Sequence, residues 1–363
     1  MASVTERLPL TFAVVVALPF LMFATWSCQA EKGTRDTKVG SCVGKQVYSS
    51  SDLTSVAASA HAGTTFCIHD GRYHVASNIP VQSGDTFTGV YSDDSRPTVS
   101  TDRAEQIFHT ARADGATIRN LAVQGAVGGN YCEPNCGRGI GGGGEHLTVV
   151  NVHATQNANQ GIGGTGDGLL VKNSTIDENG SPSFTEDDGN ASAAGIKSVN
   201  SMTVSNSRVS NNYWVGVWCD LECGEFEVRD SVIADNGKAG ISDEISSGPA
   251  VIANNSIQNN GMLVAANRHS GLLIVDSENV EVYGNTFASN VEYGVEVART
   301  GRQPGIDNIM VHDNTTKGDS LSGCELAGVR CSTTTIIGRV ERPVEGKLGL
   351  CTSPSCAPWT RLH

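Results

Sequence analysis

The feature that most constrains this fold is a repeat in the middle of the chain. Residues 216–220, with the sequence GVWCD, are matched 24 positions later by residues 240–244, with the sequence GISDE. A constant period in this range is typical of proteins built from stacked repeats. In such a solenoid each repeat forms one coil, so equivalent residues lie on neighbouring coils. Asp220 and Glu244 are therefore expected to stack about 4.8 Å apart, which is the spacing of neighbouring strands.

Similar strand-like units recur on both sides of this pair. Each unit alternates apolar and polar residues and is rich in β-branched side chains, which is typical of β-strands. Short polar segments rich in Asn and Gly follow most of the units. Asn and Gly tolerate a left-handed backbone, so these segments are expected at the corners of the coils. They are Glu178–Gly180, Asn211–Asn212, Asp235–Gly237, Asn259–Gly261 and Ser289–Asn290.

This pattern resembles the right-handed parallel β-helix family, the pectate lyase-like superfamily, over residues 63–340. The two coils at 216–220 and 240–244 are most similar to those of uncharacterised secreted bacterial members. The predicted fold is therefore all-β, a single-domain right-handed parallel β-helix. A helix over Ser51–Ala62 is expected to cap its open end, as terminal repeats must do. A β-sandwich is the alternative, since short alternating strands also suit that class, but the regular period favours the solenoid.

The N-terminal segment indicates the compartment in which the protein acts. The apolar run Leu8–Phe23 follows a single basic residue, Arg7, which predicts a secretory signal peptide. The alternatives are a retained membrane anchor and a lipid on Cys28, and either would attach the protein to the cell envelope. The protein is otherwise expected to be secreted. The predicted divisions are a signal peptide (1–30), an N-terminal segment with the cap helix (31–62), the β-helix (63–340) and an irregular disulfide-containing tail (341–363).

The chain has 11 cysteines, an odd number, and Cys28 is the natural leftover. In a chain with a signal sequence, the remaining even set predicts disulfides between cysteines that are near in sequence. A zinc site formed by Cys132, Cys136, Cys219 and Cys223 is the alternative. The expected disulfides are Cys42–Cys67, Cys132–Cys136, Cys219–Cys223, Cys324–Cys331 and Cys351–Cys356.

Side chains of a strand alternate between the inside and the outside of a coil. If Val217 and Ile241 point inward, their neighbours Trp218 and Ser242 point outward. Aligning the coils by their Gly-apolar pairs adds further residues to one outward patch. Aromatic rings beside carboxylates suit a sugar ligand. The predicted catalytic residues are Asp220, Glu244, Lys197, His269 and Arg268, and the predicted substrate-binding residues are Trp218, Tyr213, Trp214, Ser242 and Glu296.

The pair Asp220 and Glu244 is the strongest candidate for function. Two like charges stacked on neighbouring coils repel each other unless a cation, a proton or a ligand offsets them. Clustered carboxylate oxygens suit Ca²⁺, so calcium is the candidate cofactor at this pair. If the pair is a plain surface pair, the next candidate is the acidic segment Glu186–Asp188.

The family resemblance implies a polysaccharide as substrate, because secreted β-helix proteins commonly act on such polymers. The favoured prediction is a polysaccharide lyase that performs β-elimination on a uronate-containing glycan, with Lys197, Arg268 or His269 as the base. A glycoside hydrolase that uses Asp220 and Glu244 is one alternative. A non-catalytic glycan-binding or cell-envelope protein is the other. The motifs of polygalacturonases and of uronan epimerases are missing, so the resemblance names no reaction.

Composition limits the partners. The chain has 25 basic and 38 acidic residues, giving a net charge of −13. A nucleic-acid partner is therefore not expected, and neither is an anionic membrane surface apart from the N-terminal alternatives. A solenoid grows by adding coils, so a chain of 363 residues is expected to form one elongated domain and to act as a monomer.

Overall fold

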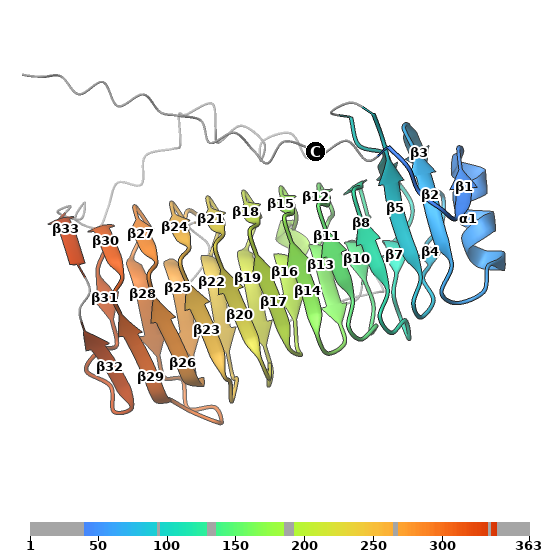
Figure 1. The fold of residues 1–363 in the computed structure, drawn as a ribbon. Helices are drawn as coiled ribbons and strands as arrows, with labels where there is room; N and C mark the ends of the chain where they lie inside the picture. Colours follow the sequence, from blue (N-terminus) through green and yellow to red (C-terminus); the bar gives the residue numbers. More distant parts are fainter. Residues whose placement is uncertain are drawn as a thin grey trace, which may run out of the picture. The chain divides into compact units, whose positions relative to one another are not determined.

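A computed structural model describes residues 40–92, 95–128, 136–184, 192–263, 268–332 and 335–339. The strands of this part form three parallel sheets that wind into a solenoid (Figure 1). Each complete coil contributes one strand to each sheet, and successive coils pair in parallel along the axis. The predicted right-handed parallel β-helix is confirmed. The predicted signal peptide and the predicted C-terminal tail lie outside the described residues.

The strands and their bounds are as follows. Sheet 1 contains β1 (Lys45–Val47), β2 (Thr65–His69), β5 (Thr86–Val90), β8 (Thr117–Arg119), β11 (Thr148–Val150), β14 (Leu169–Lys172), β17 (Met202–Ser205), β20 (Phe226–Arg229), β23 (Ala250–Ala253), β26 (Glu278–Tyr283), β29 (Asp307–His312) and β32 (Val329–Ser332). Sheet 2 contains β3 (Arg72–His74), β6 (Thr98–Ser100), β9 (Ala122–Gln124), β12 (His153–Thr155), β15 (Thr175–Asp177), β18 (Arg208–Ser210), β21 (Val232–Ala234), β24 (Ser256–Gln258), β27 (Thr286–Ala288), β30 (Thr315–Gly318) and β33 (Thr335–Arg339). Sheet 3 contains β4 (Ile79–Pro80), β7 (Gln106–His109), β10 (Arg138–Gly141), β13 (Gln160–Thr165), β16 (Ala194–Ser198), β19 (Val215–Asp220), β22 (Ala239–Glu244), β25 (Ser270–Val275), β28 (Tyr293–Ala298) and β31 (Leu321–Ser322).

A helix lies at the N-terminal end of the solenoid, as predicted. Helix α1 (Ser50–Ser59) begins one residue before the predicted start and ends three before the predicted end. The Ser49 hydroxyl accepts a hydrogen bond from the Asp52 N–H, which satisfies one of the free donors of the first turn. Leu53 and Ala57 are buried, and they extend the core of the solenoid under the helix. A short 3₁₀ helix, η1 (Pro182–Phe184), lies in the turn before β16.

The interior of the solenoid is a continuous apolar stack. Val217 pairs with Ile241, and Ile241 pairs with Leu272 on the next coil. All three side chains are fully buried within one cluster that extends from the cap helix to β29. The inward direction predicted for Val217 and Ile241 is therefore confirmed. Burial of such rows at roughly 25 cal/mol per Å² of apolar surface is the main stabilising contribution to each coil.

The corners of the coils are made by polar residues, also as predicted. The first residues of the five corner segments adopt φ between 54° and 58°, the left-handed region; they are Glu178, Asn211, Asp235, Asn259 and Ser289. The asparagine at the next position points inward and forms a ladder. Each Asn Nδ2 donates to the Oδ1 of the asparagine on the next coil at 2.9–3.0 Å, and the last donates to Asp319; the ladder is Asn157, Asn179, Asn212, Asn236, Asn260 and Asn290.

Three of the five predicted disulfides are present, Cys42–Cys67, Cys219–Cys223 and Cys324–Cys331. Cys136 is also disulfide-bonded, while Cys132, Cys351 and Cys356 lie outside the described residues. The zinc alternative is excluded for Cys219 and Cys223, because both sulfurs are used in their disulfide. Disulfides are typical of proteins outside the cytoplasm, so the cysteines support that compartment. No helix among the described residues has the length and hydropathy needed to cross a bilayer.

Candidate functional site

The outer face of sheet 3 carries the predicted columns of polar residues. Strand register places Lys197, Trp218, Ser242, Leu273 and Glu296 opposite one another on successive coils. A second column follows two residues later, where Asp220 pairs with Glu244, and Glu244 with Val275. The alignment of the coils by their Gly-apolar pairs therefore predicted the relative placement of these residues. We call this surface the sheet 3 patch, defined by Lys197, Trp218, Asp220, Ser242, Glu244 and Glu296.

Lys197 contacts both an acidic and an aromatic residue of the patch. Its Nζ lies 2.9 Å from Asp220 Oδ2 and 3.4 Å from the centre of the Trp218 ring. Only 12% of the lysine side chain and 14% of the aspartate side chain are exposed. Burial lowers the pKa of Lys197, although the charges of Asp220 and Glu244 act in the opposite direction. A lysine in such a place gives up its proton more readily than a lysine in water.

Glu244 is paired with a residue that the sequence did not single out, Arg302. The Nη2 atom of Arg302 lies 2.7 Å from Glu244 Oε1, and its Nε atom lies 3.3 Å from Asp276 Oδ2. Arg302 comes from the turn after β28, which follows Glu244 by two coils. Hydrogen bonds and charge from Glu244 and Asp276 raise the pKa of Arg302 despite its partial burial.

The carboxylate pair was expected to be offset by a cation, a proton or a ligand, and in the structure cations of the protein lie beside both carboxylates. Asp220 is compensated by Lys197, and Glu244 by Arg302, so the protein itself supplies the offsetting cations. Within the described residues, the one group of three or more His, Cys, Asp or Glu side chains close enough to share a metal is Asp114, Glu145 and His146. Asp220 and Glu244 lack a third such ligand there, and calcium binding at the pair stays a prediction.

The two tryptophans are placed as predicted but are not exposed. Trp214 is 2% and Trp218 is 4% exposed, because both pack in a small apolar cluster with Phe184, Ala194 and neighbouring residues outside the solenoid. Their faces are therefore covered and do not offer a platform for a sugar ring, which corrects the sequence-based interpretation. Neither indole N–H has a hydrogen-bond partner within the part of the chain that the structure describes.

The remaining predicted residues surround this centre. Glu296 forms an ion pair with Arg268 and accepts a hydrogen bond from the Ser270 hydroxyl at 2.6 Å. His269 uses Nδ1 to contact the carbonyl oxygen of Gly261 at 2.8 Å, so that atom holds the inserted turn. Arg268 and Ser270 belong to the first coil beyond Ser242 and Glu296 to the second, whereas Asp220 and Lys197 lie one and two coils before it.

Ser242 and Tyr213 are the last two of the predicted substrate-binding residues. Ser242 is buried between Trp218 and Leu273 in the column, and Tyr213 is half-buried in the turn before β19. The backbone N–H of Tyr213 donates to the Asn179 carbonyl at 2.7 Å, which fixes the turn. The fallback segment Glu186–Asp188 lies outside the described residues.

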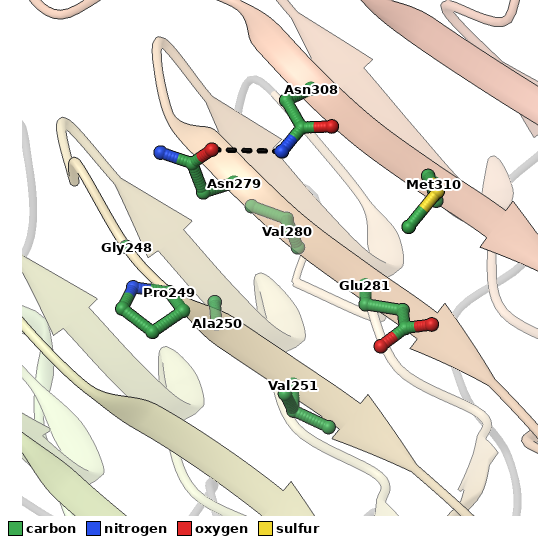
Figure 2. Close-up of a pocket in the computed structure, with 9 residues that line it drawn as sticks. All are labelled: Gly248, Pro249, Ala250, Val251, Asn279, Val280, Glu281, Asn308 and Met310. Atoms are coloured by element: carbon green, nitrogen blue, oxygen red, sulfur yellow. Dashed lines mark hydrogen bonds between the residues drawn. The ribbon is translucent and has the colours of Figure 1, made fainter.

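A depression of about 360 Å³ lies elsewhere, on the outer face of sheet 1 (Figure 2). Val251, Glu281 and Met310 line it from neighbouring strands, and Asn308 Nδ2 donates to Asn279 Oδ1 at 2.8 Å at its edge. Of the described residues that line it, only Glu281 has an ionisable side chain, and that carboxylate lies 3.1 Å from His312 Nε2. The described lining residues of the depression include no second acid or base, so the sheet 3 patch is the better candidate for a catalytic site.

Comparison with known proteins identifies the fold. The family model described as "Right handed beta helix region" matches residues 43–243 and 188–316. The solved surface adhesin PfbA of Streptococcus pneumoniae is 11% identical, with a TM-score of 0.50 over 81% of this chain and 88% of that chain. The mannuronan C-5 epimerase AlgE6 A-module of Azotobacter vinelandii is 14% identical, with a TM-score of 0.44 over 82% of this chain and all of that one. None of the curated proteins matches the chain.

Proposed function

The chain belongs to the right-handed β-helix family, and we propose that it is a polysaccharide lyase whose reaction centre is the sheet 3 patch. The observation that carries this proposal is Lys197, a buried lysine with a lowered pKa held between Asp220 and Trp218. Its substrate would be a glycan that contains uronate sugars. The protein would act outside the cytoplasm as a secreted monomer, in keeping with its disulfides.

The reaction is a β-elimination. A base removes the proton on the carbon next to the sugar carboxylate, the electron pair forms a carbon–carbon double bond, and the glycosidic oxygen leaves with a proton. Such a reaction needs a base near its working pH and positive charge near the sugar carboxylate. Neutral Lys197 is suited to the first task. Arg302 and Arg268 supply cations on the following coils.

The hydrolase alternative receives less support from the same geometry. A glycoside hydrolase needs one carboxylic acid that stays protonated at the working pH. Asp220 is paired with Lys197 and Glu244 with Arg302. The hydrolase would therefore have to use two carboxylates that cations of the protein already engage.

The test is a panel of polysaccharides incubated with the full chain, followed for ultraviolet absorbance of an unsaturated product and for new reducing ends. A lyase gives both signals on at least one uronate polymer. Reducing ends alone would favour the hydrolase and would contradict the proposal. Binding with neither signal would leave the non-catalytic glycan-binding function. Adding a chelator to the active sample tests the predicted calcium, since loss of activity that calcium restores would support it.

A further inference from the structure

The turn that delivers Arg302 is held by a single buried carboxylate. Asp276, fully buried at the end of β25, accepts hydrogen bonds from the N–H groups of Thr300, Gly301 and Arg302 at 2.9–3.3 Å. It also accepts the Thr300 hydroxyl and Arg302 Nε. Burial alone would raise the pKa of Asp276, but these hydrogen bonds outweigh it and lower the pKa. The turn is therefore anchored at one point with its arginine in a fixed orientation.

The guanidinium of Arg302 still has donors to offer. A guanidinium carries five N–H groups, and the contacts to Glu244, Asp276 and Thr300 use only Nε–H and one side of Nη2. The side chain is 42% exposed, so the remaining N–H groups face solvent. A guanidinium edge with two parallel N–H groups matches a carboxylate in a two-pronged contact. Because the side chain is already ordered, little rotamer freedom remains to be lost on binding.

We propose that Arg302 forms a second carboxylate-binding subsite of the sheet 3 patch, and that Asp276 is its positioning residue. This inference rests on the proposed function, because it assumes a polyuronate substrate. Lys197 Nζ contacts Asp220 and Arg302 contacts Glu244, and these two carboxylates lie on adjacent coils, so the two cations are offset by about one coil, roughly 5 Å, along the solenoid axis. A polyuronate carries a carboxylate on every sugar. A chain lying along the axis can therefore react at Lys197 while Arg302 holds the carboxylate of a sugar further along.

The same turn contains a matched control. Arg299 is exposed, lies three residues before Arg302, and donates from Nη2 to the Ile306 carbonyl at 3.4 Å. It belongs neither to the contacts between Asp276 and the turn nor to the sheet 3 patch. Arg302→Gln and Arg299→Gln therefore remove the same charge from the same turn. If the effect of Arg302 were only the general attraction of a cation for an acidic polymer, the two substitutions would weaken binding equally.

The experiment measures binding of the full chain to galacturonate and mannuronate oligomers of four sugars by calorimetry, as free acids and as methyl esters. We expect Arg302→Gln to raise Kd for the preferred free acid about tenfold, and to leave Kd for the ester unchanged. Arg299→Gln should change neither by more than about twofold. Asp276→Asn should reproduce the Arg302→Gln result although the arginine is present, and Arg302→Lys should fall in between because it keeps the charge and loses the fork.

Several outcomes would overturn the inference. The first is that Arg302→Gln and Arg299→Gln weaken binding of the free acid equally. The second is that Arg302→Gln weakens binding of the free acid and of the ester equally. The third is that the wild-type protein binds the free acid and the ester with the same Kd. Arg302→Lys guards against loss of fold in the glutamine variant, and thermal unfolding of every variant is compared with wild type. Failure of the proposed function is seen separately. Wild-type protein that shows the Arg302-dependent preference but forms no unsaturated product would refute the lyase and retain the subsite.

Discussion

Asp243 and Glu244 are neighbours in the sequence, yet they lie on opposite faces of β22. Asp243 points into the solenoid, beside Cys219 of the coil before, and is fully buried. Neither of its carboxylate oxygens has a hydrogen-bond partner among the residues that the structure describes. Glu244 points outward and is paired with Arg302 at 2.7 Å. Burial raises the pKa of Asp243 to about 7, while the partner of Glu244 is a cation.

The difference shows how one strand supports two kinds of chemistry. Inside the solenoid, burial keeps the carboxyl group of Asp243 protonated at pH values below about 7, and in that form it behaves as a small polar group within an apolar stack. Outside, the charges are kept and each is matched by a cation on another coil. A function that depends on charge is therefore expected on the outer face only, and changes to the inner face should alter stability instead.

The largest effect that would test this comparison is on the outer face, at Lys197. We expect Lys197→Arg to keep the ion pair with Asp220 and the contact with Trp218 but to lose activity by about 10²–10⁴, because arginine does not give up its proton. Elimination rates measure the loss, and thermal unfolding serves as the control. Full activity in the arginine variant would show that Lys197 is only structural.

The next effect concerns the inner face. Because burial raises the pKa of Asp243 to about 7 from 3.8, the folded state holds this proton more tightly than the unfolded chain. Below about pH 4 the carboxyl group is protonated in both states and does not lower the free energy of unfolding. As pH rises towards 7 it lowers that free energy increasingly, by up to on the order of 4 kcal/mol. Asp243→Asn should therefore raise the free energy of unfolding at pH 8 and leave it nearly unchanged at pH 4. Denaturant unfolding at both values measures this, and an equal effect at the two would contradict the assignment.

A third comparison uses two adjacent leucines of β25. Leu272 is inside the main core, whereas Leu273 lies outside in a small cluster with Ala239, Val275 and Ala298. Leu272→Ala should cost about 3 kcal/mol or more of unfolding free energy, since a cavity in a closed stack cannot collapse. Leu273→Ala should cost clearly less, because its surroundings can relax towards solvent. Similar losses measured by denaturant unfolding would show that the outer cluster is as rigid as the core.

The smallest expected effect is a shift in a pH profile. The charge of Asp220 raises the pKa of Lys197, so Asp220→Asn should lower that pKa. A base acts in its unprotonated form, and the rising limb of the residual activity should therefore move to lower pH. Elimination rates across pH, compared with wild type and with Asp177→Asn on sheet 2, check this. A shift to higher pH would contradict the assignment of the limb to Lys197.

The sequence was sufficient for the coils and for the register of the patch. The Gly-apolar pairs of successive coils were enough to predict which neighbouring residues share an outward column, because strand periodicity and coil length are local properties. It also contained a signal for Asp243, which occupies an inward position by simple alternation. The burial of Trp218 was not predictable in this way. Alternation gives the direction of a side chain, whereas its exposure depends on segments such as η1 that pack over the sheet.

The position of Arg302 was also not predictable from the sequence. It contacts Glu244 across 58 positions of sequence, through a turn whose path is set by Asp276. No period relates these residues, because the turn interrupts the repeat. Its composition, with glycines at 301 and 305, indicates only a turn. The cations that balance the patch thus come from one regular position, Lys197, and one irregular position.

The asparagine ladder gives the solenoid a direction. Every amide-to-amide hydrogen bond in it runs from Nδ2 to the Oδ1 of the next coil towards the C-terminus, so the row behaves as a polar chain with a head and a tail. Adding or deleting whole coils between Asn157 and Asn290 preserves this order, which makes the molecule adjustable in length by duplication. Cutting the chain before Asp319 removes the acceptor that ends the row. The carboxylate at that position therefore ends the ladder, because it accepts the last amide N–H and has no amide of its own to donate further.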